Sequence, residues 1–141
     1  MARFCQGRMT RLLVVSTSLA LAILPGQMAD AQSSRQQVLA VRTASDFFDA
    51  LDDGDIEKAT ELAADVVSDG LKKTIYTRKS QFGGRWAGDN RRDLVRVNEG
   101  TGEAVVVFHA RYEKVTLEQT ALVSCASRCI VKAFKEAPAE Y

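Results

Sequence analysis

Apolar residues between positions 38 and 82 recur at three- and four-residue steps, which is the spacing of amphipathic helices. The pattern predicts helices over 38–51, 56–66 and 71–82. The first stripe stops at an Asp-Asp-Gly-Asp corner. There, Gly54 can take the left-handed conformation that closes a helix, and Asp55 can cap the next helix.

From position 91 onward the period of the pattern changes to two, which is typical of strands. Strands are predicted over 92–97, 104–112, 115–125 and 129–134. Glycine-rich residues at 98–102 predict the first turn. Helices followed by an antiparallel meander indicate an α+β fold, with N-terminal helices packed on one face of a four-stranded sheet.

A proposed register sorts the last three strands into two faces. If Glu113-Lys114 is a two-residue turn and Cys125 pairs with Cys129, then facing residues share a side. One side is apolar except for Gln119 and carries no carboxylate: Val106, Phe108, Ala110, Tyr112, Val115, Leu117, Gln119, Ala121, Val123, Cys125, Cys129, Val131 and Ala133. The other side is mixed: Val105, Val107, His109, Arg111, Thr116, Glu118, Thr120, Leu122, Ser124, Ile130, Lys132 and Phe134.

Residues 1–31 have the three-part layout of a secretory signal peptide. Three arginines precede an apolar run over 12–24, Pro25-Gly26 breaks that run, and Ala29-Asp30-Ala31 provides a small-x-small cleavage pattern. A bilayer span needs about 20 residues, more than this run offers, although a retained anchor is the alternative. We expect cleavage after Ala31, one domain over 32–141, and a periplasmic or secreted location without a stable membrane span.

The overall charge is nearly balanced, with 19 Lys and Arg against 18 Asp and Glu in 141 residues. Such a balance offers no global field for nucleic acid, so a nucleic-acid partner is not expected. The charges are nevertheless segregated, with acidic residues concentrated over 46–69 and basic residues over 72–96. These stretches are either two solvated faces that attract one another, or an acidic and a basic patch for a protein partner.

Several motifs resemble a family of small secreted bacterial proteins, the domain of unknown function 4019. Residues 44–55 match its opening helix and Asp-x-Gly-Asp corner, and residues 78–83 match an Arg-x-x-x-(Leu/Phe)-Gly step. Residues 106–112 and 118–122 match its strand patterns, whereas 129–134 lacks the family's closing Trp and Gly. The resemblance implies a cone of the nuclear transport factor 2-like or cystatin-like kind, in which a curved antiparallel sheet wraps around the helices. The family brings no established activity, so no catalytic residue is carried over.

Two cysteines remain after cleavage of the leader, in an exported and therefore oxidising setting. Cys125 and Cys129 face each other in the proposed register, so we predict a disulfide across the last hairpin. The loop is short, and its entropic stabilisation is about 2 kcal/mol or less. The alternatives are a thiol redox pair and a soft-metal site. The redox pair lacks the usual two-residue spacing, and the metal site lacks a third ligand.

His109 is the only histidine, and it pairs with Glu118 on the mixed side, so a surface pair is expected rather than a general base.

Aromatic residues indicate a candidate binding site, a pocket at the mouth of the cone. Trp86 could cover this mouth, although a core or edge aromatic is the alternative. The pocket-lining residues would be Phe47, Trp86, Phe108, Tyr112 and Gln119.

No catalytic set, cofactor or metal site is predicted. We expect a small, exported, non-catalytic binding or interaction domain whose partner is an envelope protein or a small hydrophobic ligand. The alternative is a cone-fold enzyme for a small hydrophobic substrate, using Tyr112 and a carboxylate. A carboxylate within hydrogen-bond reach of Tyr112 would favour that alternative. A third class is an assembly or inhibitor protein that pairs through sheet edges.

Overall fold

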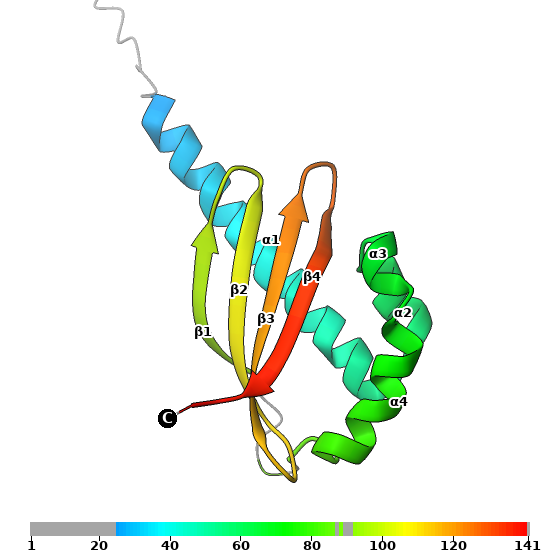
Figure 1. Ribbon diagram of the computed structural model, residues 1–141. Helices are drawn as coiled ribbons and strands as arrows, with labels where there is room; N and C mark the ends of the chain where they lie inside the picture. The colour runs from blue at the N-terminus through cyan, green and yellow to red at the C-terminus, as the bar shows by residue number, and fades with distance from the viewer. Residues whose placement is uncertain (1–24, 87, 89–91, 141) are drawn as a thin grey trace, which may run out of the picture.

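A computed structural model describes residues 25–86, 88 and 92–140, with side chains from residue 33 onward. The elements are α1 (Pro25–Asp53), α2 (Ile56–Glu61), α3 (Asp65–Ser68), α4 (Leu71–Phe82), β1 (Arg92–Glu99), β2 (Glu103–Arg111), β3 (Thr116–Cys125) and β4 (Cys129–Pro138). The strands form one antiparallel sheet in the order β1-β2-β3-β4. Helix α1 crosses one face of this sheet, and α2–α4 follow on the β4 side (Figure 1). The predicted α+β class is confirmed.

Most of the predicted leader, residues 1–24, lies outside the described residues. The described part of helix α1 starts at Pro25. The helix runs without interruption through Ala31, the expected cleavage position. None of the helices in the described part of the chain combines the length and apolar character needed to cross a bilayer.

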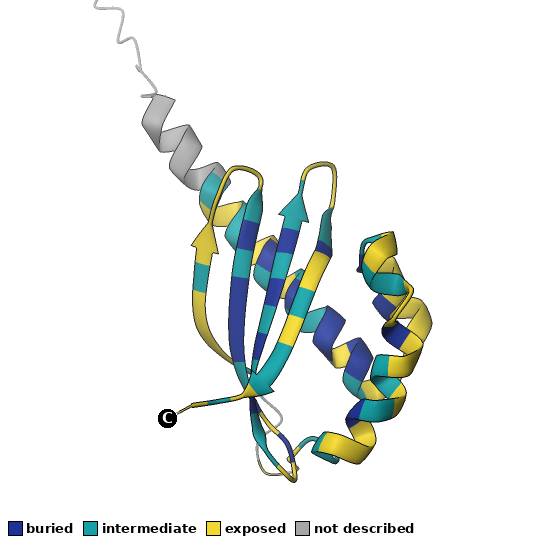
Figure 2. Cartoon of the chain, viewed as in Figure 1, coloured by how far each residue is buried: buried dark blue, intermediate teal, exposed yellow. Residues whose placement is uncertain are grey.

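The main core lies between α1 and the sheet. Helix α1 contributes one buried face, made of Ala40, Ala44, Phe47, Phe48 and Leu51. The ring of Phe48 contacts those of Phe108 and Phe134 at centroid distances of 6.3 and 6.2 Å. Figure 2 shows that buried positions are concentrated on α1 and the central strands. Val38, which opens the predicted stripe, is instead 66% exposed.

The second predicted helix, 56–66, is interrupted and forms two short helices, α2 and α3. Asp55 caps α2 as expected, because its side chain accepts a hydrogen bond from the Lys58 N–H at 3.0 Å. The interruption comes from the sheet: the Ala64 N–H donates to the Val131 carbonyl at 2.9 Å, and the Val131 N–H donates to the Leu62 carbonyl at 2.7 Å. Backbone groups that bond to β4 cannot also continue the helix.

The proposed register is confirmed between β2 and β3, where His109 faces Glu118, and at the pair Cys125–Cys129. It is wrong further along β4, because an irregularity between Leu122 and Val123 shifts the pairing with β4 by one residue. A one-residue shift exchanges the two faces of a strand. Phe134 therefore packs in the core and Ala133 is exposed, the reverse of the prediction.

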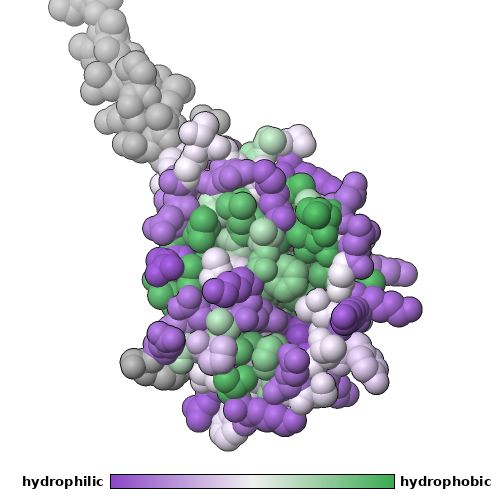
Figure 3. Space-filling view, viewed as in Figure 1, coloured by the Kyte–Doolittle hydropathy of each residue, from purple (hydrophilic) through white to green (hydrophobic). Residues whose placement is uncertain are grey.

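The second face of the sheet is mixed, as predicted. It is turned towards the viewer in Figure 3, where hydrophobic patches lie between hydrophilic side chains. His109 and Glu118 lie on this face as the expected surface pair, with 3.5 Å between Nε2 and Oε2.

Candidate functional site

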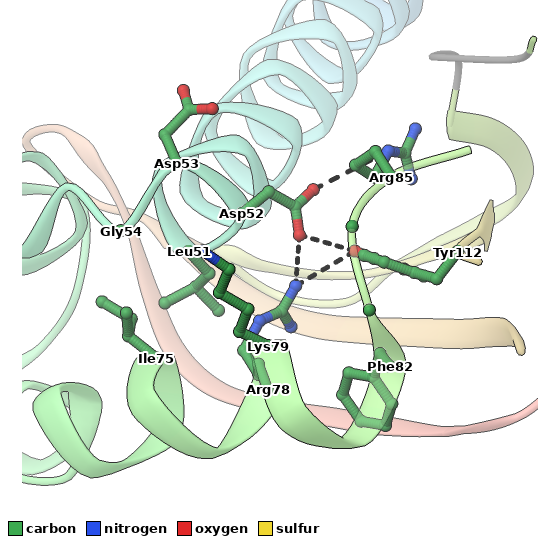
Figure 4. A pocket seen from close by; sticks show the side chains of 12 residues that line it. Leu51, Asp52, Asp53, Gly54, Ile75, Arg78, Lys79, Phe82, Arg85 and Tyr112 are labelled. Carbon is green, nitrogen blue, oxygen red and sulfur yellow. Dashed lines mark hydrogen bonds and ion pairs between the residues drawn. The ribbon is translucent and has the colours of Figure 1, made fainter. Parts of the chain in front are cut away.

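A buried carboxylate occupies the last turn of α1. The Asp52 side chain is 9% exposed, and its Oδ1 accepts a hydrogen bond from the Tyr112 hydroxyl at 2.7 Å. The same oxygen pairs with Arg78, and Oδ2 pairs with Arg92. Arg85 approaches Oδ2 with its Nε at 3.8 Å. Figure 4 shows Asp52 between Arg78, Arg85 and Tyr112. Segments from α1, α4, β1 and the end of β2 thus meet at one carboxylate.

Gln119 and Glu136 complete the cluster from β3 and β4. The fully buried Gln119 donates from Nε2 to the Tyr112 hydroxyl at 2.9 Å and to Glu136 Oε1 at 2.7 Å. Its Oε1 accepts from Arg92 Nε at 2.8 Å. Arg78 also pairs with Glu136. We call this set the polar network: Asp52, Arg78, Arg92, Tyr112, Gln119 and Glu136.

The pKa values in the polar network follow its charges. Burial opposes the charged form of Arg78, but its hydrogen bond to Glu136 and the charge of that residue outweigh burial and raise the pKa of the guanidinium. Burial likewise opposes the charged form of Arg92, whose pKa is raised by Asp52 and Asp49. Burial and then the Asp52 charge raise the pKa of Tyr112. The phenol therefore stays protonated at neutral pH and donates to the carboxylate.

A pocket of about 270 Å³ opens beside the polar network. The pocket has a charged end, formed by Asp52, Arg78 and Arg85, and an apolar side. Its lining residues are Leu51, Asp52, Asp53, Gly54, Ile75, Arg78, Lys79, Phe82, Gly83, Gly84, Arg85 and Tyr112. In Figure 4 these side chains come from the end of α1, from α4, from the segment that follows α4 and, for Tyr112, from the end of β2. The lining combines opposite charges with aliphatic and aromatic surface, so it offers both polar and apolar contacts.

The turn between β2 and β3 holds the pocket wall in place. Gly83 ends α4 with φ +73°, and a Cβ there would lie 2.7 Å from Glu113 Oε2, so both the backbone and the close approach require glycine. The Gly84 N–H donates to the same Glu113 oxygen at 3.3 Å. Lys114 Nζ donates to the Ser80 carbonyl at 2.8 Å, in the last turn of α4. Glu113 and Lys114 thus anchor this wall.

The five predicted lining residues do not form one pocket. Tyr112 lines the pocket and belongs to the polar network, and Gln119 contacts it from within the network. Phe47 and Phe108 are buried in the main core. Trp86 is 41% exposed and is absent from the lining. The guanidinium of Arg111 instead lies 4.6 Å from its ring centroid.

Sequence reasoning missed the charged members of the site. Its expectation of an inner face without a carboxylate is wrong, because the shift in β4 and the extension of that strand to Pro138 place Glu136 opposite Gln119. Asp52 belongs to the acidic stretch over 46–69, for which the sequence predicts a solvated face or a patch for a partner rather than burial. One signal was available: Gln119 is the polar residue on an otherwise apolar face, and a buried amide needs polar partners.

The two cysteines lie at the other end of the sheet. Cys125 and Cys129 form the predicted disulfide across the β3–β4 turn, and both are half-buried. In the part of the chain that the structure describes, no group of three His, Cys, Asp or Glu side chains is placed to hold a metal ion.

Comparison of the chain with protein-family models, with curated proteins and with solved structures finds no match.

Proposed function

We propose that the chain is an exported, non-catalytic binding domain with a cone-like fold similar to that of the domain of unknown function 4019. Its ligand site is the pocket between α1 and α4, and the polar network is the rigid floor of that site. One observation carries the proposal: the side chains of the polar network bond to one another, and a pocket lies beside them. The disulfide supports export, because such bonds persist in oxidising compartments.

The hydrogen bonding of Tyr112 argues against catalysis. A neutral phenol has one donor and two acceptor sites. Tyr112 donates to Asp52 and accepts from Gln119 Nε2 and Arg78 Nη2, at 2.7, 2.9 and 3.0 Å. Both Asp52 oxygens also accept from guanidinium groups. Proton exchange with a substrate would break contacts that hold the end of α1 to the sheet.

The pocket lining indicates the class of ligand. Leu51, Ile75 and Phe82 offer apolar surface, while Lys79 and Arg85 offer donors. A pocket of about 270 Å³ lies just below the usual range for small-molecule sites, so its ligand must be small. We therefore propose a small molecule with an apolar body and a polar end, in agreement with the small hydrophobic ligand expected from the sequence.

One observation favours a second candidate, the cone-fold enzyme. A carboxylate within hydrogen-bond reach of Tyr112 was the feature that would favour it, and Asp52 Oδ1 lies 2.7 Å from the hydroxyl. In an enzyme of this kind, Tyr112 would donate to a substrate oxygen that reaches the charged end of the pocket. Tyr112→Phe would then abolish turnover of any bound compound. If the domain only binds, the same variant leaves the bound compound chemically unchanged, as does the wild type.

Native mass spectrometry of the protein purified from the periplasm, without reduction, tests the binding site. Ile75→Trp would fill the pocket, whereas the matched control Tyr76→Trp changes a neighbouring side chain that is 84% exposed and outside the lining. We expect a bound small molecule in the wild type and in the control, and its loss in Ile75→Trp. A ligand that persists in Ile75→Trp would place binding elsewhere. A bare protein in every sample would contradict the ligand proposal.

A further inference from the structure

The exposed side of α4 combines lysines with a large aromatic ring. Lys72, Tyr76 and Lys79 are spaced by four and three residues, so they share one helix face, and Lys73 adjoins them. Tyr76 is 84% exposed, and α4 contains no acidic residue. Among the described residues, no ion pair involves these lysines. We call this surface the basic patch: Lys72, Lys73, Tyr76 and Lys79.

The segment just before α4 has the opposite charge. Its exposed carboxylates belong to α2, α3 and the residue that follows α3, and Lys58 is the basic residue among them. Val66 lies within this segment and is 78% exposed. We call this surface the acidic patch: Glu57, Glu61, Asp65, Val66 and Asp69. Each patch therefore combines one strongly exposed large side chain, Val66 or Tyr76, with exposed charges of one sign, although Lys58 lies among the carboxylates.

The two patches meet at Gly70. This residue has φ −98°, which any amino acid can adopt, and a Cβ added to it would meet nothing within 4 Å. Neither the backbone nor the packing within one chain requires glycine here. Because Gly70 has no side chain, nothing protrudes from the surface at the boundary between the patches.

We propose that the two patches form an interface between two copies of this chain, related by a twofold axis near Gly70. Because the patches are consecutive, such an axis places each acidic patch on the basic patch of the second copy, so the complementary contact is made twice. Four carboxylates offset by Lys58 face three lysines in each contact. The side chains of Tyr76 and Val66 would be buried in this contact, and Gly70 lets the two backbones approach each other.

Charge complementarity favours a second copy over an anionic lipid surface. The basic patch alone could approach such a surface, but the adjoining acidic patch would be repelled by it. A second copy uses both patches and places surfaces of opposite net charge on one another. The right-hand edge of the molecule in Figure 3, where α2–α4 lie, carries mainly hydrophilic side chains, as expected for an interface that depends on charge. Of the residues in the two patches, Lys79 also lines the ligand pocket, and the others lie outside that lining.

Paired charge reversals provide the sharpest test, using sedimentation velocity on the purified protein. Lys72→Glu with Lys73→Glu makes both patches acidic, and Glu61→Lys with Asp65→Lys makes both basic. We expect the wild type to form dimers, each double variant to stay monomeric, and an equal mixture of the two variants to form heterodimers. A monomeric wild type would overturn the proposal, as would double variants that dimerise like the wild type or a mixture that stays monomeric.

Substitution at the proposed axis separates docking from folding. Gly70→Gln adds a side chain that one copy can accommodate but the dimer cannot, so we expect at least a tenfold weaker association with an unchanged circular dichroism spectrum. Gly100→Gln is the matched control, because its Cβ would meet only the Glu103 carbonyl at 3.9 Å, in the β1–β2 turn. Equal association of both variants would overturn the proposed axis.

Measurements with salt and with lipid vesicles distinguish a second copy of the chain from a membrane surface as the partner of the two patches. An interface of opposite charges should weaken about tenfold between ~50 mM and ~500 mM salt, because the screening length shortens. Association that salt leaves unchanged would contradict the charged interface. A wild type that stays monomeric but binds vesicles of phosphatidylglycerol, with binding lost in the Lys72→Glu, Lys73→Glu variant, would replace the second copy with a membrane surface.

Discussion

Two buried regions of this protein share the same helix and strand faces but have opposite chemistry. Phe48 and Asp52 are four residues apart on α1, so they lie on one face, yet Phe48 belongs to the main core and Asp52 to the polar network. Phe134 and Glu136 repeat this change along β4. The regions adjoin where the Arg92 guanidinium lies 5.7 Å from the centroid of the Phe48 ring.

The two regions are stabilised in different ways. Apolar contacts have no direction and depend mainly on the area removed from water, so a core can repack around a change of similar volume. Buried charges stabilise only when every partner is present, because removal of one leaves another charge uncompensated in a poorly solvating environment. The core should therefore respond to lost volume, and the polar network to a lost charge even when volume is preserved.

The largest effect is expected from a cavity in the main core. Phe48→Ala removes a fully buried ring that contacts three other phenylalanines, and it should lower the free energy of unfolding by about 4 kcal/mol. Urea denaturation followed by circular dichroism gives this value. Val38→Ala is the control on the same helix and should stay within about 0.5 kcal/mol, because Val38 is 66% exposed. Equal losses in both variants would contradict this assignment of the core.

An isosteric change in the polar network comes next. Asp52→Asn keeps the side-chain volume but removes the charge that Arg78 and Arg92 share, and should cost about 3 kcal/mol. Asp53→Asn is the matched control at the exposed neighbouring position, with an expected change below about 0.5 kcal/mol. The same denaturation series measures both variants. If Asp52→Asn is as stable as Asp53→Asn, the network does not depend on its charge.

The disulfide adds a third, covalent kind of stabilisation at the opposite end of the sheet. Replacing Cys125 and Cys129 together by Ser should lower the free energy of unfolding by about 2 kcal/mol or less, because the closed loop is short. The double variant should keep the native circular dichroism spectrum. Dithiothreitol should destabilise the wild type by a similar amount and leave the double variant unchanged. An equal response of both proteins to dithiothreitol would show that the bond is not formed.

The different physical origins of the two regions explain what could be predicted from the sequence. Periodicity locates Phe47, Phe48 and Phe108, because burial of an apolar face depends on residues within a single element. The register across β2 and β3 follows from the same local alternation. Phe134 was assigned to the wrong face because the pairing shift in β4 depends on contacts between strands.

The polar network could not be assembled in this way because its six members come from six different segments of the chain. Glu136 lies beyond the predicted end of the last strand at 134, and Asp52 lies at a helix end where a solvated side chain is the usual expectation. Arg78 and Arg92 are separated in the sequence and become neighbours only in the folded chain. Gln119 was the one residue that indicated the site. A single amide on an apolar face requires polar partners, but the sequence does not show which residues those partners are.

The smallest expected effect sharpens the comparison through pH. Tyr112→Phe removes one hydroxyl from the polar network and should cost about 1 kcal/mol near neutral pH. The pKa of Tyr112 is raised above its ordinary value of 10.0, first by burial and then by Asp52, so the folded state holds this proton more tightly than the unfolded state. The hydroxyl therefore contributes its full stability below pH 10.0, and loses it as pH rises from there through the raised pKa.

The wild type and Tyr112→Phe should consequently converge in stability above pH 10.0, as measured by urea denaturation across an alkaline pH series. Tyr76→Phe, at a position that is 84% exposed, is the control and should retain the Tyr112 contribution. Phe48→Ala should lose the same amount at every pH, because a cavity carries no proton. If the difference in the free energy of unfolding between the wild type and Tyr112→Phe stays constant through this range, the phenol stabilises the protein by its volume alone. The contrast between the two regions would then not extend to Tyr112.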